Sequence, residues 1–270
     1  MKKLLSFIEK FYIAIIFLIL YVPIVVLIFQ SFNKSKFRSV WGGFTLEWYR
    51  TLFSDGKMVD TLLTTFGIAF LAALVATLLG LVACLGINGM KGAPKALIST
   101  VTNIPLLNAD TVTGIAMLLL FVRMKMLFTG FSLGLGSVLI SHITFCLPYV
   151  VLSIMPRLRQ SSKSTYEAAL DLGASGPRAF FSVVLPDIFP GILTGFLLSF
   201  TMSIDDFVIT YFTKGPGIDT ISTMIYSGMK KGISPEVYAL STLMFAAILI
   251  VLYITNKLSD KNKKVKEERI

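Results

Sequence analysis

Histidine, cysteine and charged residues are scarce in this sequence, and each scarcity excludes a class of protein. The chain has 270 residues with one histidine, His142, and two cysteines, Cys84 and Cys146. The lone histidine has no cysteine partner at metal-ligand spacing, and both cysteines lie in apolar runs, where nothing indicates a disulfide. Charged residues make up only 15% of the chain, too few for the surface of a soluble domain of this length. We therefore expect no metal site, and a bilayer around much of the chain.

A phosphate-binding loop is also missing. The Walker A motif needs Gly-Lys followed by Ser or Thr, which together hold phosphate and magnesium. The one Gly-Lys pair of the sequence, Gly56-Lys57, is followed by Met58. The chain is therefore not expected to hydrolyse ATP or to act as an enzyme.

What the sequence has in abundance is long apolar runs. Hydrophobic residues make up 55% of the chain, and the mean hydropathy is +0.79. A helix needs about 20 apolar residues to cross a bilayer. We therefore expect an all-α polytopic membrane protein, a single domain over residues 1–270. Its six transmembrane helices are expected near Ile13–Phe29, Thr61–Ile87, Thr100–Phe121, Gly134–Met155, Ile188–Phe212 and Val237–Asn256.

The first run follows three lysines, as in a secretory signal, but it is longer than a signal core. No small-residue cleavage site follows it at Phe29-Gln30-Ser31-Phe32, so we interpret it as a retained anchor. With the N-terminus inside, cytoplasmic segments hold fifteen of the 25 Lys and Arg residues, which predicts cytoplasmic termini. The basic tail, residues 257–270, is expected to contact anionic lipid rather than nucleic acid.

Most of the connections between these runs are short, but residues 156–187 form a long connection that is cytoplasmic by this charge distribution. We call it the elbow loop. Ser164 and Glu167 fit a capping box that starts a helix of about two turns. Gly173 suits the left-handed conformation that closes such a helix.

A second short helix is expected to start at Ser175, with Pro177 in its first turn, and to end at Leu185-Pro186. Two helices that meet at a glycine form a compact elbow. Ala168 and Ala169 give the elbow a face with little side-chain bulk, which another protein can approach closely. By physics alone, this face is either a docking surface or a simple capped turn.

The elbow loop resembles the EAA signature of permease subunits of bacterial ABC importers. The match comprises Glu167-Ala168-Ala169, Gly173, Val183 where isoleucine is usual, and Leu185-Pro186 at the family's spacing. The resemblance implies a type I importer permease fold in which this loop is the coupling helix. It implies that Glu167, Ala168, Ala169 and Gly173 contact a separate ATPase, which binds the ATP and magnesium.

Three acidic residues lie inside the predicted transmembrane runs, and no basic residue matches them. Asp110 is near the middle of the third run, and Asp205 and Asp206 are in the outer part of the fifth. Ionisable residues are costly within a bilayer, and carboxylates lining an aqueous path favour a cation. Adjacent helical residues point about 100° apart, so one of the pair is expected to line the path while the other caps backbone or pairs with a basic group. Asp110 follows Asn108, where the helix can break, and either contacts substrate or caps the next helix.

Most of the chain resembles PotC-type permeases of spermidine/putrescine importers. The likeness includes Gly43–Tyr49, Leu198–Phe212 and Ile225–Val237. It implies alternating-access import of polyamine across the bacterial inner membrane. The implied partners are a second, homologous permease, an ATPase dimer and an extracytoplasmic polyamine-binding protein. The residues that it implies in the substrate path are Asp110, Ser203, Asp205, Asp206 and Trp48.

Alternatives remain at this point. An importer for another solute, such as ferric iron, thiamine or an aminophosphonate, would share the elbow loop but should lack the acidic pair. A stand-alone carrier or channel would show internal repeats or a filter and needs no docking elbow. Trp48 is otherwise an interfacial anchor. We interpret His142 as a helix-packing residue rather than a proton relay.

Overall fold

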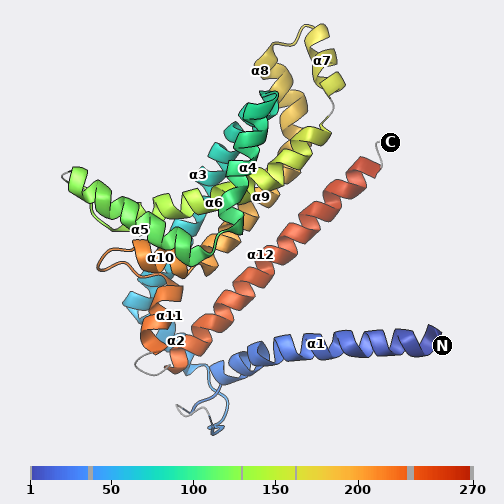
Figure 1. The fold of residues 1–270 in the computed structure, drawn as a ribbon. Coiled ribbons are helices and arrows are strands. Elements are labelled where there is room, and N and C mark those ends of the chain that lie inside the picture. The colour runs from blue at the N-terminus through green and yellow to red at the C-terminus, as the bar shows by residue number, and fades with distance from the viewer. Residues whose placement is uncertain (1, 36–38, 129, 162, 230–233, 268–270) are drawn as a thin grey trace. The chain divides into compact units, whose positions relative to one another are not determined.

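A computed structural model describes residues 2–35, 39–128, 130–161, 163–229 and 234–267 (Figure 1). Over these residues the chain is helical, with one isolated β-bridge between Asn33 and Phe44, which confirms the all-α class. Residues 230–233, part of a stretch quoted above for the family resemblance, lie outside the described residues. The elements are α1 (Lys2–Ser31), α2 (Glu47–Ser54), α3 (Gly56–Gly89), α4 (Ala93–Leu107), α5 (Asp110–Leu127), α6 (Leu135–Gln160), α7 (Lys163–Asp171), α8 (Gly176–Ala179), the π-helical turn η1 (Phe180–Val184), α9 (Leu185–Asp205), α10 (Val208–Thr213), α11 (Ile221–Met229) and α12 (Pro235–Glu267).

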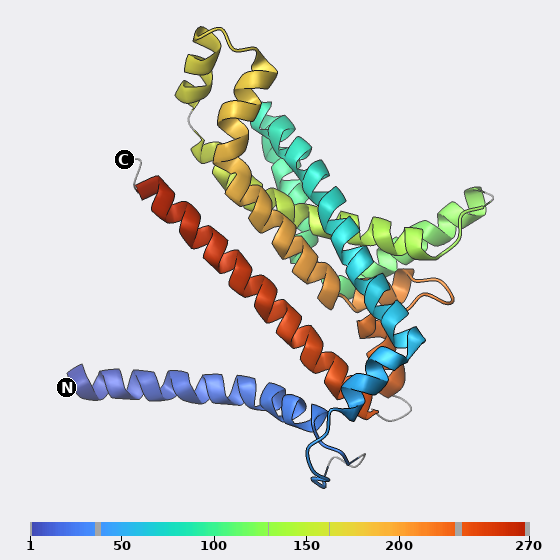
Figure 2. The same ribbon diagram turned by 180° about the vertical axis from the view of Figure 1, so that it is seen from behind.

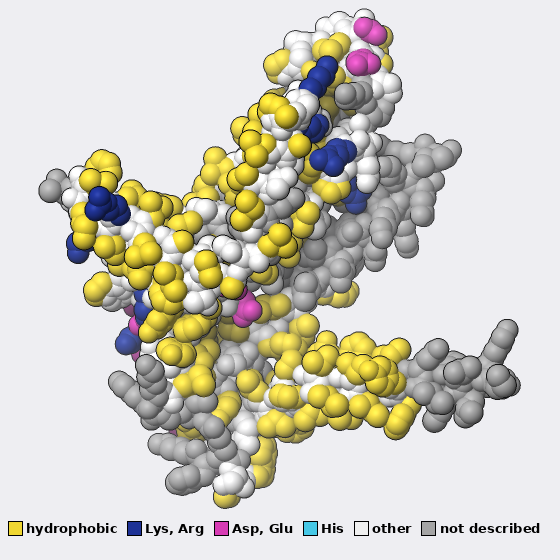
Figure 3. Space-filling model, viewed as in Figure 1, with side chains coloured by type: hydrophobic (Ala, Val, Ile, Leu, Met, Phe, Trp, Pro, Cys, Tyr) yellow, Lys and Arg dark blue, Asp and Glu magenta, His cyan; other side chains and the backbone are white. Residues whose placement is uncertain are grey.

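Four helical segments of the described chain are long and apolar enough to cross a membrane. They are Lys10–Ser31, Gly56–Gly89, Leu135–Gln160 and Gly176–Asp205, and a shorter apolar stretch covers Pro235–Ile250. These match the first, second, fourth, fifth and sixth predicted runs. Figure 3 shows hydrophobic side chains spread along the described helices. Exposed apolar faces of this extent fit a chain surrounded by lipid and partner subunits.

The third predicted run is two helices rather than one. Pro105 lies in the last turn of α4, where it cannot donate a backbone hydrogen bond, and the helix ends at Leu107. Asn108 and Ala109 are extended, with ψ values of 144° and 137°. Asp110 then opens α5, but Ala109 is the N-cap and makes no side-chain capping bond. The predicted break is therefore present, whereas the alternative that Asp110 caps the second helix is wrong in this structure.

The chain forms two compact units. The larger holds residues 61–224 and 251–270. Within it, α6 packs along α9, as Figures 1 and 2 both show, and α5 and α6 both pack against α10. Its apolar core joins α3, α6, α9 and α10 through Cys84, Cys146, Val150, Ile154, Ile188 and Ile209, among others.

Gly114 allows α5 and α10 to lie close together. A Cβ atom at this position would lie 2.9 Å from Phe212 Cδ2 and 3.5 Å from the Ile209 Cα. The contact with the α10 backbone would be an ordinary van der Waals contact, but a side chain at this position would have to displace the Phe212 ring. The short helix α10 is thereby held against the bundle, next to the acidic pair.

The smaller unit holds residues 1–60 and 225–250. Its loop between α1 and α2 is organised by Asn33, which is buried. The Asn33 side-chain amide donates to the Val40 carbonyl at 2.9 Å, and its Oδ1 accepts from the Gly42 N–H at 2.8 Å. The Trp48 indole N–H donates to the Asn33 carbonyl at 2.7 Å. Trp48 is thus a buried anchor of this loop.

The elbow loop departs from prediction at its far end. The chain does not leave the helical conformation at Leu185-Pro186, because α8, η1 and α9 follow one another without a break. The Leu185 N–H bonds the Phe180 carbonyl, an i to i+5 bond that widens the helix by one residue. Such a π-turn lets the chain pass a proline, which has no N–H to donate, without ending the helix.

Candidate functional site

The acidic pair lies where the fifth predicted run breaks. Asp205 is the last residue of α9, Asp206 is extended with ψ at 124°, and α10 begins at Val208. The sequence predicted a continuous helix here, and this prediction is wrong, because the structure has two helices, α9 and α10. The two carboxylates are therefore separated by a change in backbone direction and not only by the helical 100°.

The Asp206 carboxylate points into the protein, with its side chain 5% exposed. Its Oδ1 accepts from the Ile209 N–H at 3.2 Å, and its Oδ2 accepts from the Thr210 N–H at 2.8 Å. The Thr210 hydroxyl also donates to Oδ2 at 2.8 Å. Asp206 thus satisfies the free N–H groups at the start of α10, the capping role expected for one member of the pair.

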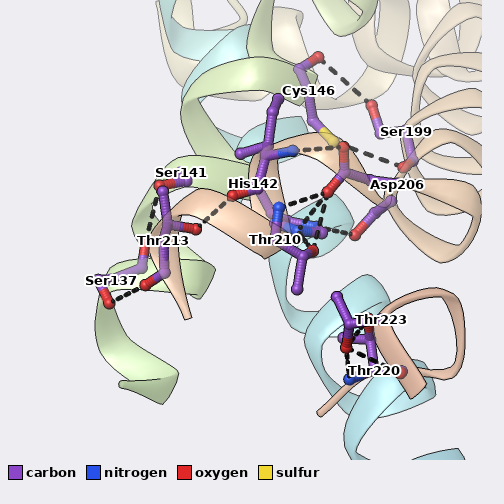
Figure 4. A network of polar contacts seen from close by, with 12 residues as sticks. Ser137, Ser141, His142, Cys146, Ser199, Asp206, Thr210, Thr213, Thr220 and Thr223 are labelled. Carbon is purple, nitrogen blue, oxygen red and sulfur yellow. Dashed lines mark hydrogen bonds and ion pairs between the residues drawn. The ribbon is translucent and has the colours of Figure 1, made fainter. Parts of the chain in front are cut away.

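His142 of α6 joins both sides of the break (Figure 4). It is 1% exposed, and its Nδ1 lies 2.6 Å from the Ser203 Oγ of α9. Its Nε2 lies 2.8 Å from the Thr210 Oγ1 and 3.4 Å from Asp206 Oδ2. The single hydroxyl proton of Thr210 is directed to Asp206, so the Thr210 oxygen accepts from Nε2 and places a proton on that nitrogen.

Asp205 and Asp110 are both exposed, unlike Asp206. Within the described part of the chain, neither carboxylate has a hydrogen bond or ion pair with another residue. Each stands beside a helix break, Asp205 before the one at Asp206 and Asp110 after the one at Ala109. The sequence predicted both inside transmembrane runs, where an unpartnered carboxylate is costly unless water or a cation reaches it. These two are available to a ligand.

The five residues predicted for the substrate path therefore lie in three settings. Ser203 and Asp206 are brought together around His142, Asp205 and Asp110 are exposed, and Trp48 is buried in the smaller unit. The path role of Trp48 stays a prediction, because its side chain here holds the loop of its own unit.

The elbow loop forms the compact turn that its sequence predicts. The backbone of Gly173 has φ at +87°, in the left-handed region. The Gly173 N–H bonds the Leu170 carbonyl at 2.9 Å, and the Ala174 N–H bonds the Ala169 carbonyl at 3.1 Å. This pair of bonds is the Schellman motif, which satisfies the last carbonyls of α7. α7 begins at Lys163, so Ser164 lies in its first turn and not at the predicted cap.

The second elbow helix also follows its sequence. Pro177 lies in the first turn of α8 as predicted, and Ser175 is the N-cap residue, although its side chain makes no capping bond. Glu167 and Ala168 are exposed, whereas Ala169 is half-buried. Leu172, beside Gly173, is 89% exposed.

A pocket of about 500 Å³ lies beside this elbow. Tyr166 and Glu167 line it together with Asn88 at the end of α3 and Leu158 at the end of α6. Segments that the charge distribution assigned to one side of the membrane therefore meet at one end of the larger unit. An exposed apolar residue, a small-residue face and a pocket together make a surface suited to another protein.

Sequence reasoning missed three residues that organise these sites. His142 was interpreted only as a packing residue, and Thr210 and Asn33 were not singled out. The sequence did carry a signal for His142. It is the one histidine of the chain, and it lies inside a predicted transmembrane run of a sequence that also has an acidic pair. Its partners lie 61 and 68 residues away, so only folding shows the connection.

Solved structures show which class this fold defines. A bacterial ABC transporter that imports the acidic polysaccharide alginate superimposes with a TM-score of 0.76 and 16% identity, covering 96% of each chain. The MetNI methionine ABC transporter superimposes with a TM-score of 0.61 and 14% identity, over 74% of this chain and 93% of that one. The fold is that of an ABC importer permease with transmembrane helices, as predicted.

The sequence comparisons name the family. Residues 76–265 match the family described as binding-protein-dependent transport system inner membrane component, and the chain belongs to it. The spermidine/putrescine transport permease PotC of Haemophilus influenzae is 34% identical, covering 95% of this chain and 98% of that protein. The putrescine permease PotI of Escherichia coli K12 is 37% identical, covering 92% and 89%. The chain is thus a multi-pass membrane protein of transport systems that include a binding protein.

Proposed function

We propose that this chain is the permease subunit of an ABC importer that carries polyamines, spermidine or putrescine, into the cytoplasm by alternating access. The observation that carries the proposal is the pair of exposed carboxylates, Asp110 and Asp205, which stand at two helix breaks of the larger unit without a partner among the described residues. The PotC and PotI relatives, which are named for the transport of spermidine and putrescine, support the same cargo.

The charge of these groups fits a polyamine better than an anion. A polyamine carries several ammonium groups along a flexible apolar chain, and each ammonium needs a carboxylate or carbonyl in place of water. Two carboxylates without a basic neighbour attract cations and repel anions at short range. Breaks in the helices bring backbone carbonyls to the same places, where they can also accept from ammonium groups.

The elbow loop supplies the connection to the energy source. In the proposed cycle, an extracytoplasmic polyamine-binding protein delivers cargo, and this chain forms the path with a second, homologous permease. An ATPase dimer binds ATP and magnesium, contacts Glu167, Ala168, Ala169 and Gly173, and drives the change of access. The chain itself performs no catalysis. Both termini and the elbow loop face the cytoplasm in this arrangement.

Uptake of labelled putrescine and spermidine tests the proposal. The complete importer is expressed in cells that lack other polyamine importers. Wild type should accumulate label, and Asp205→Asn combined with Asp110→Asn should reduce uptake by about tenfold or more, since a hydrogen bond to a charged group contributes about 1.5–3 kcal/mol and about 1.4 kcal/mol corresponds to a tenfold change. Ser141→Ala, which removes a hydroxyl bonded only within α6, is the matched control. Unchanged uptake in the double variant would contradict a cation path through these residues.

A further inference from the structure

One side chain of α6, His142, contacts both sides of the break between α9 and α10. α9 ends at Asp205 and α10 has only six residues, Val208–Thr213. A helix this short has little stability of its own and depends on tertiary contacts. Its polar contacts with α6 are the Ser137 hydroxyl, which donates to the Thr213 carbonyl at 2.7 Å, and the His142–Thr210 pair.

His142 differs from Ser137 because it reaches both helices at once. One ring nitrogen contacts Ser203 on α9, and the other contacts Thr210 on α10 and the Asp206 carboxylate between them (Figure 4). The rigid imidazole fixes the separation of its two nitrogens, and therefore the separation of the groups they contact. Because Asp206 also caps α10, the orientation of its carboxylate and of that helix are set together.

We propose that His142 is a positioning residue of the transport path. By holding Ser203, Asp206 and Thr210, it keeps the Asp206 carboxylate inside the bundle and leaves the adjacent Asp205 carboxylate exposed for the cargo. The acidic pair is thus divided into one structural and one ligand-binding carboxylate. This inference rests on the proposed function for the cargo, but the division of the pair stands on the geometry alone.

The interior position of Asp206 argues for the division. Its two oxygens already accept from two backbone N–H groups and one hydroxyl, with the imidazole Nε2 nearby. A carboxylate with its lone pairs so used has little left for an ammonium group, and releasing it would leave the start of α10 uncapped. Asp205 has no such partner within the described residues.

Three substitutions at position 142, which keep different hydrogen bonds of the imidazole, test the positioning role of His142 in the complete importer. Gln carries its amide near the Nε2 position and can still donate toward Thr210 and Asp206. Asn reaches only toward Ser203, and Leu reaches neither. We expect His142→Gln to keep a KM for polyamine uptake near that of wild type. We expect His142→Asn and His142→Leu to raise KM by about tenfold, the effect of about 1.4 kcal/mol, with a smaller change in maximal rate. Ser141→Ala again serves as the neighbouring control.

Hydrogen–deuterium exchange of the peptide covering residues 206–213 gives a readout that does not need transport. The amides of Ile209 and Thr210 bond the Asp206 carboxylate, so they should exchange faster in His142→Leu and at the wild-type rate in Ser141→Ala. Wild-type exchange in His142→Leu would overturn the claim that His142 holds the break. Faster exchange with an unchanged KM would overturn the positioning role and leave a purely structural one.

Two further outcomes are informative. If His142→Leu is absent from membranes because Asp206 is left as a buried charge, His142→Leu combined with Asp206→Asn removes that charge. The double variant should return to the membrane and still show the raised KM, and a wild-type KM in it would overturn the proposal. If the wild-type importer takes up no polyamine, the proposed cargo is wrong, whereas the exchange measurement still decides whether His142 fixes the break.

Discussion

At the scale of single residues, two adjacent side chains of the same type differ in their exposure to solvent. Asp205 and Asp206 are neighbours of the same type, yet one is exposed and the other is 5% exposed and multiply bonded. Their sequence predicted that the two would differ, one in the path and one capping or paired. It did not predict which, because the partners that capture Asp206 come from α6 and α10.

Cysteine substitution distinguishes the two positions directly. Asp205→Cys should react with a membrane-impermeant cationic thiol reagent, and Asp206→Cys should react at least about tenfold more slowly, as expected for a buried thiol. The native Cys84 and Cys146 are fully buried and provide a low background. Labelling is measured by mass shift in membranes that contain the whole importer. Equal reactivity at both positions would contradict the division of the pair.

The loss of one hydrogen bond can be measured at Trp48. Trp48→Phe keeps most of the apolar ring but removes the indole N–H that donates to the Asn33 carbonyl, leaving a buried carbonyl unpaired. We expect it to destabilise the purified chain by about 1–3 kcal/mol, measured by thermal unfolding in detergent. A path residue without this structural role would lower uptake at unchanged stability, so the two measurements together decide between the roles.

At the scale of elements, glycine and proline determine how the elbow loop folds. Gly173 closes α7 in a left-handed conformation, and Pro186 follows a π-turn that carries the helix onward into α9. The elbow is therefore joined rigidly to a transmembrane helix. Because α8, η1 and α9 are continuous, we expect a displacement of α8 by a docked partner to be transmitted to α9.

Substitutions at Gly173 should follow the cost of a left-handed backbone. Asn adopts positive φ with little penalty and should preserve uptake, whereas a β-branched residue is strongly disfavoured there, by about 1–2 kcal/mol. We expect Gly173→Val to reduce uptake and weaken pull-down of the ATPase, and Gly173→Asn to do neither. Gly86→Ala, at an open helical position in α3, is the control. If Gly173→Val assembles and transports normally, the shape of this turn is not needed for coupling.

At the scale of the whole molecule, the chain is one component of a larger transport system. Its helices expose apolar side chains such as Leu18, Ile19 and Val82, which need lipid or other subunits to cover them. It lacks a Walker A motif, and its family works with a binding protein. We propose that energy conversion and cargo capture come from other chains.

Reconstitution tests this division of labour. The purified chain in nanodiscs should hydrolyse no ATP above background, whereas the complete importer should hydrolyse ATP, and faster when the binding protein and polyamine are added. Glu167→Lys should reduce this stimulation, because it reverses a charge on the elbow surface. ATPase activity of the purified chain alone would contradict a non-catalytic role.

Short-range signals in the chain were enough to predict the class of this protein. Apolar runs of the length of a bilayer and the EAA-like spacing predict a permease, because hydropathy and turn chemistry act over short stretches of chain. Gly173 and Pro177 took their predicted places for the same reason. The tertiary structure alone decided that Asp206 turns inward, that His142 joins two helices and that Trp48 is buried. These outcomes depend on partners far away in sequence, such as His142 and Ser203, which only packing of α6 against α9 brings within hydrogen-bond distance.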